Sequence, residues 1–468
     1  MIEVTSCRGQ TVAVMGLGAS GLAAARALVA GGATVFAWDD SAAKREAAEK
    51  AGVRTTDITA IDWRDVALLV MSPGIPHRFP KPHPVPAAAR AAGVAIVCDV
   101  ELLARSRGEA RYVGITGTNG KSTTTALIGH ILTETGHEAE VGGNLGPAAL
   151  SLKPLGRNGV YVLELSSYQL ELILSVAFDV AVLLNITPDH LGRHGGMDGY
   201  IAAKRHIFDH ARAGATAVVG VDDEPSRKIR AELDQGGGWR VVPVSSVGPA
   251  ARGVYVKDGA LIDDLDGAGR TALDLTQVAT LPGAHNWQNA AAAYAVARAL
   301  GVAPAETTRA IASFPGLPHR QELIAIIDGV RYVNDSKATN ADAAEKALVC
   351  YDHIYWIAGG QPKEGGIDSL TAHFPRIVHA FLIGEAAQAF AKVLDGRVPY
   401  TLAGDLASAV AAARNLAAGP EGVSGGVVLL SPACASFDQF ANFEARGDRF
   451  RALVKHLPGE RQAAGAAA

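Results

Sequence analysis

A glycine-rich segment, GTNGKST at residues 117–123, has the residue types and spacing of a loop that holds phosphate groups. Its glycines let backbone N–H groups approach a phosphate, and the start of a following helix favours negative charge. Lys121 can reach the terminal phosphates of a nucleotide, and the hydroxyl of Ser122 can bind Mg²⁺. The general pattern of such loops has glycine where this chain has Ile115, so we predict a shortened variant. The alternative, a turn without a ligand, fits poorly with the apolar strand before the loop and the helical pattern after it.

A second group of residues could hold a divalent cation beside that loop. Glu164 ends an apolar strand, and His190 lies in NITPDH at residues 185–190, just past another strand. A carboxylate and an imidazole near the phosphates could hold Mg²⁺ between a nucleotide and a second substrate. Taken singly, each could equally be a solvated or a core residue. Lys204 lies in a predicted helix over residues 200–210, where a lone lysine is normally a solvated surface residue.

The segment GLGASG at residues 16–21 follows an apolar strand and is typical of a loop that binds a diphosphate. Asp39 ends the next strand, where nicotinamide-dependent enzymes place an acid, so an oxidoreductase is one hypothesis. Any diphosphate ligand would satisfy the same loop, including a UDP-sugar. A tight turn without ligand is the third possibility.

Two further loops follow predicted strands and are rich in polar residues: NDSKATN at residues 334–340 and SPACASFDQF at residues 431–440. Ligands bind at the carboxyl ends of strands in open α/β sheets, so both segments are candidate ligand loops. By propensity alone, ordinary surface loops remain an alternative.

Strands and helices alternate along the chain in three blocks, which is typical of parallel sheets. The length of 468 residues also indicates roughly three domains. We predict domains over residues 1–109, 110–315 and 316–468. The predicted strands lie at residues 11–15, 34–38, 67–71, 112–116, 160–164, 180–185, 354–358, 380–383 and 427–430. A hairpin is predicted around Asp328-Gly329, and a helix over residues 285–300.

The composition, 49% hydrophobic and 19% charged, allows large buried cores. The net charge of −4 argues against broad binding of nucleic acid. Residues 11–38 are almost uncharged, but glycines and Arg26 interrupt them, and we expect neither a membrane span nor a signal peptide. The four scattered cysteines favour reduced thiols over a disulfide framework or a zinc site. We therefore expect a cytoplasmic protein, and a monomer.

Together these motifs resemble those of the Mur ligases of peptidoglycan synthesis. The resemblance runs from Gly16 to about Arg446. It rests on the segments GLGASG, SPGIP, GTNGKST, GNLG, LELSSYQLE, NITPDHLGRH, YIAAK, GAHNWQNAAAA, GLPHR, NDSKATN, GGQPKEGG and SPACASFDQFANFEARG. The middle motifs are shared with folylpolyglutamate synthases, whereas the first and last are similar to those of the D-glutamate-adding branch.

The resemblance implies an α/β fold with three domains: a Rossmann-like N-terminal domain for a UDP moiety, a central P-loop ATPase-type domain with a mostly parallel sheet, and a Rossmann-like C-terminal domain that closes over the amino acid. It implies that ATP phosphorylates the carboxylate of UDP-N-acetylmuramoyl-L-alanine and that the amine of D-glutamate attacks the acyl phosphate. The tetrahedral intermediate then gives an amide, ADP and phosphate. Mg²⁺ at two sites and CO₂, as a carbamate on Lys204, are the implied cofactors.

The family's functional residues fall on matching positions of this sequence. The implied catalytic residues are Lys121, Glu164, His190, Lys204 and Lys337. The implied metal ligands are Ser122, Glu164, His190 and carbamylated Lys204. The implied ATP contacts are Gly117, Thr118, Asn119, Gly120, Lys121, Ser122, Thr123, Asn286, Asn289, Arg320 and Asp335. The implied substrate contacts are Gly18, Ala19, Ser20, Gly74, Asn144, Gln169, His190, Thr339, Lys363, Ser436, Phe437 and Phe443, of which Lys363, Ser436, Phe437 and Phe443 match positions for D-glutamate.

The sequence departs from the family pattern in three places. Asp39-Asp40-Ser41 stands where some relatives carry Thr-Arg to bind uracil and phosphate, Gln361-Pro362 precedes Lys363, and Phe437 replaces a leucine. The competing hypotheses are another Mur ligase or a folylpolyglutamate synthase, the oxidoreductase, and a nucleotide-binding scaffold without activity. The glycine-rich first block argues against a folate enzyme, and the oxidoreductase leaves GTNGKST unexplained.

Overall fold

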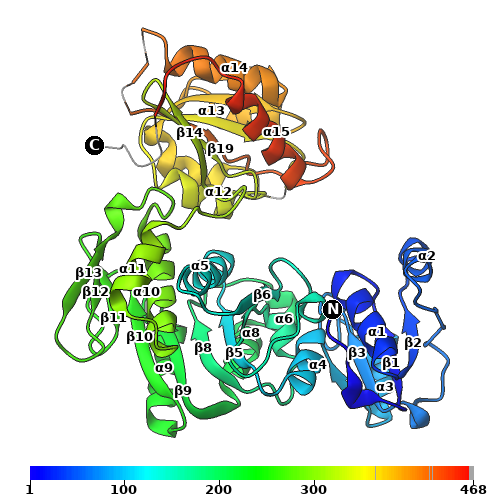
Figure 1. The fold of residues 1–468 in the computed structure, drawn as a ribbon. Helices are drawn as coiled ribbons and strands as arrows, with labels where there is room; N and C mark the ends of the chain where they lie inside the picture. Colours follow the sequence, from blue (N-terminus) through cyan, green and yellow to red (C-terminus); the bar gives the residue numbers. More distant parts are fainter. Residues whose placement is uncertain (364, 421, 424, 463–468) are drawn as a thin grey trace. The chain divides into compact units, whose positions relative to one another are not determined.

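The computed structural model describes residues 1–363, 365–420, 422–423 and 425–462 and contains three β-sheets with helices packed on them (Figure 1). The chain forms two compact units: Met1–Leu275 with Ala284–Ser313, and Thr276–Gly283 with Phe314–Ala468. Two sheets lie in the first unit and one in the second. The predicted α/β class with mostly parallel sheets is confirmed, whereas the predicted domain limits stay a prediction.

The first sheet has four parallel strands in the order β2-β1-β3-β4. Its strands are β1 (Thr11–Met15), β2 (Thr34–Trp38), β3 (Leu68–Met71) and β4 (Ala95–Val97); its helices are α1 (Ala19–Ala30), α2 (Ala42–Lys50), α3 (Pro84–Ala91) and α4 (Asp99–Ser106). The strand order reverses around β1, so β1 and β3 flank a switch point. GLGASG follows β1 and SPGIP follows β3, which brings both loops to the carboxyl ends of these strands.

The second sheet has nine strands in the order β13-β12-β11-β10-β9-β8-β5-β7-β6. Its strands are β5 (Arg111–Thr116), β6 (Ala139–Gly143), β7 (Val160–Glu164), β8 (Phe178–Leu183), β9 (Ala211–Gly220), β10 (Arg240–Ser245), β11 (Val254–Lys257), β12 (Ala260–Asp263) and β13 (Arg270–Asp274). Its helices are α5 (Lys121–Glu134), α6 (Ser167–Leu170), α7 (Leu191–His194), α8 (Met197–Arg205), α9 (Glu224–Gly236), α10 (Ala284–Ala299) and α11 (Pro304–Ala312). Only β12 and β13 join the sheet by antiparallel pairing. The alanine-rich α10 packs against α5 and so brings its polar first turns to the phosphate loop.

The predicted helix around Lys204 differs from the observed one. α8 begins at Met197, directly after Gly195 and Gly196, which both have positive φ, and it ends at Arg205. Three further residues, His206–Phe208, form a 3₁₀ turn instead of continuing the helix to residue 210. Helix ends are commonly tightened in this way, so the predicted C-terminal limit was too long and the N-terminal limit too late.

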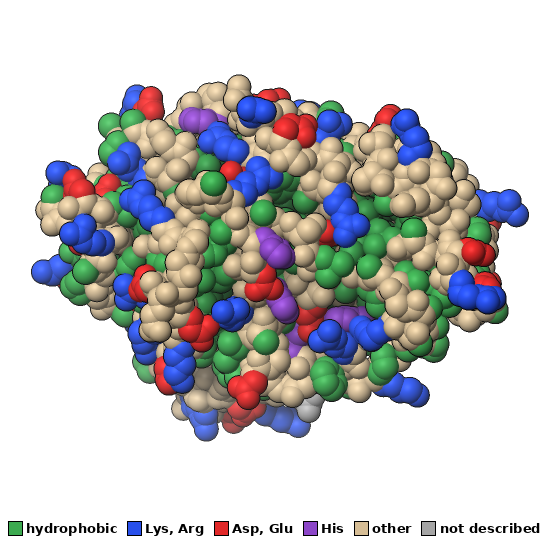
Figure 2. Space-filling model, turned by 90° about the horizontal axis from the view of Figure 1, so that it is seen from below, with side chains coloured by type: hydrophobic (Ala, Val, Ile, Leu, Met, Phe, Trp, Pro, Cys, Tyr) green, Lys and Arg blue, Asp and Glu red, His purple; other side chains and the backbone are tan. Residues whose placement is uncertain are grey.

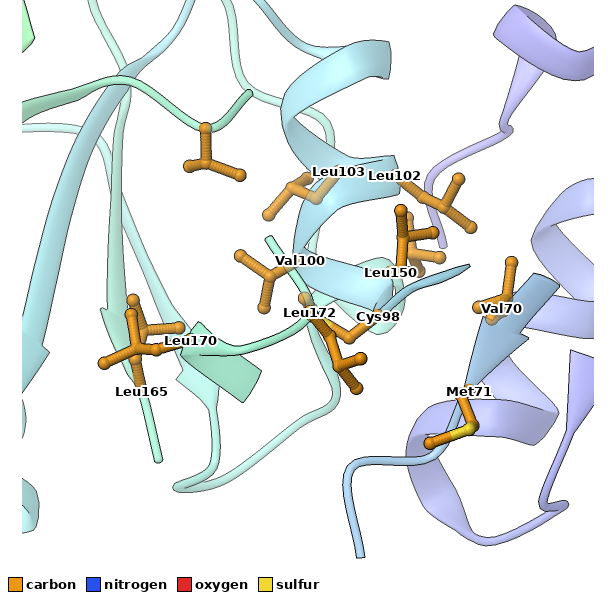
Figure 3. Packing of buried hydrophobic residues seen from close by; sticks show 14 of the residues in the cluster. Val70, Met71, Cys98, Val100, Leu102, Leu103, Leu150, Leu165, Leu170 and Leu172 are labelled. Carbon is orange, nitrogen blue, oxygen red and sulfur yellow. The ribbon is translucent and has the colours of Figure 1, made fainter. Parts of the chain in front are cut away.

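One apolar cluster runs through both sheets of the first unit. Figure 3 shows Val100, Leu102 and Leu103 of α4 packed among Val70 and Met71 from β3 and leucines from segments that connect strands of the second sheet. Those leucines include Leu150, Leu165, Leu170 and Leu172. Because apolar burial is the main stabilising term, this cluster holds the two sheets of the unit together.

The third sheet has the order β18-β17-β16-β19-β15-β14-β20. Its strands are β14 (Glu322–Ile327), β15 (Val330–Asn334), β16 (Ile354–Gly359), β17 (Ile377–Ile383), β18 (Tyr400–Gly404), β19 (Val427–Leu430) and β20 (Arg461–Gln462); its helices are α12 (Ala341–Leu348), α13 (Ala387–Leu394), α14 (Leu406–Ala417) and α15 (Phe443–Lys455). Two apolar clusters cover its two faces, one with α12 and α13 and one with α14 and α15. Asp328 and Gly329 both have positive φ and join β14 to β15, which confirms the predicted hairpin.

Acidic and basic side chains are interspersed on the face drawn in Figure 2, and several histidines lie near its centre. No helix in the described part of the chain is both long enough and apolar enough to span a membrane.

Candidate functional site

The phosphate loop joins β5 to α5, as the sequence predicts. Gly120 has φ 85°, and a side chain there would bring a Cβ within 2.2 Å of Asn289 Oδ1, so only glycine fits. The Lys121 ammonium donates to the carbonyl oxygens of Gly117 at 2.8 Å and Thr118 at 2.9 Å. The lysine therefore lies over the loop, where phosphate oxygens would be stronger acceptors for it.

Lys204 reaches the same loop from α8. Its side chain is 1% exposed, and its Nζ donates to Gly117 O at 2.7 Å. Nζ lies 4.7 Å from the centre of the Tyr200 ring, whose hydroxyl is 3.0 Å from Thr118 Oγ1. Burial lowers the pKa of Lys204 well below its usual range, and the nearby charge of Lys121 lowers it further. The expectation of a solvated surface lysine is therefore wrong at this position. The family resemblance singled out Lys204, whereas residue propensity alone did not.

Glu164 ends β7 and is almost fully buried. Its Oε1 accepts a 2.6 Å hydrogen bond from Asn144 Nδ2, and the Asn144 amide donates to the Glu164 carbonyl at 2.9 Å. Its Oε2 is also buried, yet it has no hydrogen-bond partner among the described residues. A buried carboxylate oxygen without a donor is costly unless a cation binds it, so this atom is suited to a metal ion.

His190 lies in an exposed turn directly before α7, with φ 51°. Its side chain is 53% exposed, and its ring centre lies 5.3 Å from that of Tyr168. No hydrogen bond or ion pair within the described ranges joins His190 to Glu164 or Lys204. The imidazole is thus held on one face and accessible on the other, as a residue that meets a substrate would be.

Asn286 and Asn289 lie in the first turns of α10. Asn289 Nδ2 donates to Asn286 Oδ1 at 3.2 Å, and Asn289 Oδ1 accepts from Thr124 of α5 at 3.3 Å. Both are therefore beside the phosphate loop, where they were predicted to contact ATP.

Gln169 is buried and caps its own helix, with Oε1 accepting from the Ser166 amide at 3.0 Å.

The carboxylate of Asp39 serves the first glycine-rich loop. Its Oδ2 accepts from the Leu17 amide at 2.8 Å and its Oδ1 from the Ser41 amide at 2.9 Å. Burial raises the pKa of Asp39, but these two bonds and Lys44 lower it by more. Asp39 therefore holds the backbone of this loop, a structural role that requires no ligand.

The substrate residues predicted around that loop, Gly18, Ala19 and Ser20, begin α1. Gly18 is the N-cap, and no side chain caps the helix, so its first amides are suited to a phosphate. Gly74 lies in the loop after β3, which is tied to the same region by a 3.0 Å bond from Ser72 Oγ to Gly16 O.

In the second unit, Asp335 follows β15 and is buried beside the loop after β19. Its Oδ2 accepts from Ser431 Oγ at 2.8 Å, and its Oδ1 accepts from the Gln321 amide at 3.1 Å. Burial raises its pKa to about 7, although the hydrogen bonds oppose the shift.

Arg320 lies two residues before β14, and Lys337 Nζ lies 5.4 Å from the centre of the Phe443 ring. Thr339 is half-buried in the same loop as Lys337.

The residues predicted to hold D-glutamate come from two adjacent loops. Gln361 and Ala435 exchange backbone hydrogen bonds of 3.0 and 3.1 Å, which brings the segment with Lys363 beside the segment with Ser436. Ser436 is buried, whereas Phe437 is 68% exposed.

Arg446 is a residue that the sequence analysis did not single out. It is 1% exposed and donates to Ser336 Oγ at 2.9 Å, to Ser336 O at 2.8 Å, and to Cys434 O and Ala435 O at 3.1 and 3.2 Å. One guanidinium thus joins both candidate ligand loops of the second unit. The only signal in the sequence is its place in FEARG after the second loop, where it resembles an ordinary helix arginine.

Comparison with known proteins decides the family. The family model described as Mur ligase middle domain matches residues 115–297. The UDP-N-acetylmuramoylalanine–D-glutamate ligase of Rhodospirillum rubrum is 57% identical over 469 residues, covering 99% of this chain and 98% of that protein. The protein of the same name from Phenylobacterium zucineum is 53% identical over 465 residues, covering 98% of each chain. The chain belongs to the UDP-N-acetylmuramoylalanine–D-glutamate ligase family.

Solved structures of other Mur ligases support the fold. UDP-N-acetylmuramate–alanine ligase MurC from Thermotoga maritima aligns with a TM-score of 0.57 at 18% identity, covering 95% of this chain and 99% of that one. MurF from Acinetobacter baumannii aligns with a TM-score of 0.55 at 21% identity, covering 75% and 79%. The family predicted from the motifs is confirmed, and the oxidoreductase and scaffold alternatives are set aside in favour of a ligase.

Proposed function

We propose that the chain uses ATP to couple D-glutamate to UDP-N-acetylmuramoyl-L-alanine, a step in making cytoplasmic precursors of peptidoglycan. The observation that carries the proposal is the convergence of two lysines on one carbonyl, since Lys121 and Lys204 both donate to Gly117 O. Two amino groups so close together disfavour each other's charged form unless an anion lies beside them. The terminal phosphates of ATP would supply that anion.

The reaction would proceed in two displacements. A carboxylate oxygen of the UDP-linked substrate forms a bond to the γ-phosphorus of ATP, and the bond from that phosphorus to the β-phosphate oxygen breaks, releasing ADP. The neutral amine of D-glutamate then attacks the acyl carbon, and the tetrahedral intermediate expels phosphate. Lys121 and the amides of the GTNGKST loop hold the phosphates in line and stabilise the negative charge that develops on them.

The residues present fit a divalent cation. Glu164 Oε2 is buried without a donor in the described part of the chain, and Ser122 lies in the first turn of α5, where its hydroxyl could bind a cation held by the phosphates of ATP. No group of three His, Cys, Asp or Glu side chains that could hold a metal exists among the described residues, so phosphate oxygens would complete the ligand set. When bound, Mg²⁺ would neutralise charge on the phosphates.

The surroundings of Lys204 also fit its proposed carbamylation. CO₂ adds only to a neutral amine, and burial together with Lys121 favours the neutral form. The neutral amine nitrogen forms a bond to the carbon of CO₂, one C=O π bond becomes a lone pair on a carboxylate oxygen, and the N–H proton is released to solvent, so a neutral side chain becomes an anionic ligand. Glu164, His190 and this modified Lys204 would then surround the reacting phosphate.

ATP-dependent product formation tests the function directly. The purified chain is incubated with ATP, Mg²⁺, UDP-N-acetylmuramoyl-L-alanine and D-glutamate, and the product is followed by mass and by ADP release. The expected result is a product heavier by one glutamate residue, and no product with Lys121→Ala. Stimulation of ADP release by L-alanine or a diamino acid, but not by D-glutamate, would assign the chain to a different ligase.

A further inference from the structure

Two side chains from helical segments on the second sheet hold the loop that follows β3 of the first sheet. Glu171, just after α6, places Oε2 2.9 Å from His77 Nε2. Arg193, in α7, donates to Ile75 O at 2.7 Å and to Phe79 O at 3.3 Å. This loop, residues 72–79, contains Gly74, which is predicted to meet the UDP-linked substrate.

Glu171 also holds the segment that carries His190. Its Oε1 lies 3.2 Å from His194 Nδ1, and His194 Nε2 lies 2.9 Å from Ser167 Oγ. His77, His194 and Ser167 are all buried, so these bonds are shielded from water. One carboxylate thus bridges the imidazole of His77, in the loop after β3, and the imidazole of His194, in α7.

The hydrogen-bond pattern assigns the protons in this chain of contacts. Arg90 can only donate, and its Nη2 lies 3.4 Å from His77 Nδ1, so Nδ1 accepts and Nε2 carries the proton given to Glu171. The second carboxylate oxygen accepts from His194 Nδ1–H, and His194 Nε2 shares a hydrogen bond with the Ser167 hydroxyl. Glu171 therefore accepts both imidazole bonds as a charged carboxylate. Burial opposes that charge, but the bonds from His194 and His77 lower the pKa of Glu171 to about 2.

Arg193 and His194 are also the anchors of an otherwise weak element. α7 has four residues, and a helix this short is not stable by itself. The Arg193 guanidinium lies 4.9 Å from the centre of the Tyr168 ring, and that ring lies 5.3 Å from His190 and 5.4 Å from His194. The positive φ of His190, unfavourable for a non-glycine residue, is therefore held by contacts three and four residues further on.

We propose that Glu171 and Arg193 are positioning residues that fix the substrate loop 72–79 and His190 relative to each other. The inference rests on the proposed function, because it gives these contacts the task of placing a carboxylate from the first sheet in line with a phosphate at residues 117–123. A displacement of about 1 Å between reacting groups can lower a rate by about 100-fold. The two residues act through the backbone of these segments and do not touch the reacting atoms.

Glu171→Ala and Arg193→Lys test the inference. The alanine removes both imidazole contacts, and the lysine keeps the charge but loses the planar guanidinium that serves several carbonyls and stacks on Tyr168. Matched controls are Glu138→Gln and Arg157→Lys, which change exposed side chains of the same unit. We expect kcat to fall at least about tenfold in both test variants, with the Kd for ATP within about twofold of the parent and both controls unchanged.

Hydrogen exchange gives a readout that does not require turnover. Backbone amides in residues 72–79 and 185–194 should exchange faster in Glu171→Ala than in Glu138→Gln, while residues 117–134 keep the parent rate. Unchanged exchange in both segments, or kcat within twofold of the parent in both test variants, overturns the inference. If the parent enzyme is inactive, the proposed function is refuted. The exchange rates in residues 72–79 and 185–194 then test the positioning role of Glu171 and Arg193 by themselves. Should Glu171→Ala fail to fold, Arg193→Lys and Glu171→Gln carry the same comparison, and equal exchange in those variants and the parent overturns the inference.

Discussion

The amino groups of Lys121 and Lys204 share one acceptor, the carbonyl oxygen of Gly117, at 2.8 and 2.7 Å. Lys121 comes from the helix that follows the loop, whereas Lys204 arrives from a helix more than eighty residues later. The first is available to exchange the carbonyl for a phosphate oxygen, and the second is buried and has a lowered pKa. The two lysines therefore have different tasks, one as a phosphate ligand and one as a neutral amine open to modification.

Replacing Lys204 separates these tasks. We expect Lys204→Ala to lower kcat by about 100-fold, because the proposed carbamate acts on the reacting phosphate, while the Kd for ATP changes by less than about threefold. ADP release and calorimetric titration measure the two quantities. Lys153→Ala, which removes a solvated lysine, serves as control and should leave both unchanged. Undiminished turnover without Lys204 would remove the carbamate from the mechanism.

Glu164→Gln tests the cation site. The amide oxygen can still accept from Asn144, but the second buried position becomes a neutral amide and no longer binds a cation. The Mg²⁺ concentration for half-maximal ADP release should rise about tenfold or more. Glu134→Gln changes an exposed carboxylate at the end of α5 and should have no effect. An identical Mg²⁺ requirement in Glu164→Gln and parent would exclude Glu164 as a ligand.

Asp335 should make the stability of the second unit depend on pH. Its pKa is raised from 3.8 to about 7 by burial, so the folded form binds a proton that the unfolded form has lost between about pH 4 and pH 7. The free energy of unfolding therefore falls with rising pH in that window, by up to about 1.4 kcal/mol per pH unit from this group, and is level above it. Asp335→Asn keeps both hydrogen-bonding positions and removes the titration.

Denaturant unfolding at several pH values measures this slope. The difference between parent and Asp335→Asn isolates the group from the other carboxyls and histidines that titrate in the same range. Equal slopes from pH 4 to pH 7 in the two proteins would show that Asp335 is not protonated in the folded chain.

Arg446 is buried and holds both candidate ligand loops of the second unit, so its replacement should weaken binding of D-glutamate. Arg446→Lys retains a cation, but an ammonium cannot reach the four acceptors that the guanidinium serves on Ser336, Cys434 and Ala435. We expect the KM for D-glutamate to rise about tenfold and the midpoint of thermal unfolding to fall, with little change in the KM for ATP. Arg449→Lys, an exposed position on the same helix, is the control. A normal KM in a folded Arg446→Lys protein would reduce Arg446 to a structural residue.

Local sequence features predicted the parts of the fold that local physics determines. The phosphate loop, the central strands and the Asp328-Gly329 hairpin were predicted because glycine conformation, apolar runs and turn chemistry act over a few residues. Strands β11–β13 were missed because they have four or five residues each and lie towards one edge of the sheet. β9 and β10 were missed as well, although both contain buried apolar runs.

The site was predictable only where a motif carries its own chemistry. Lys121 and Glu164 fall in such motifs, but nothing near Lys204 in the sequence indicates a buried amine, which depends on packing of α8 against the phosphate loop. Asp39 looked like a ligand residue, yet its oxygens accept from Leu17 and Ser41, a pairing set by the tertiary path of the chain.

The apolar cluster shared by the first two sheets couples the stability of one sheet to that of the other. Neither sheet can lose its packing around α4 without exposing apolar surface of the other, so the two should melt in one cooperative transition. A ligand that binds only the folded form raises the midpoint of the transition it is coupled to. A UDP-linked molecule on the first sheet and a nucleotide on the second would then each protect the site of the other against heat.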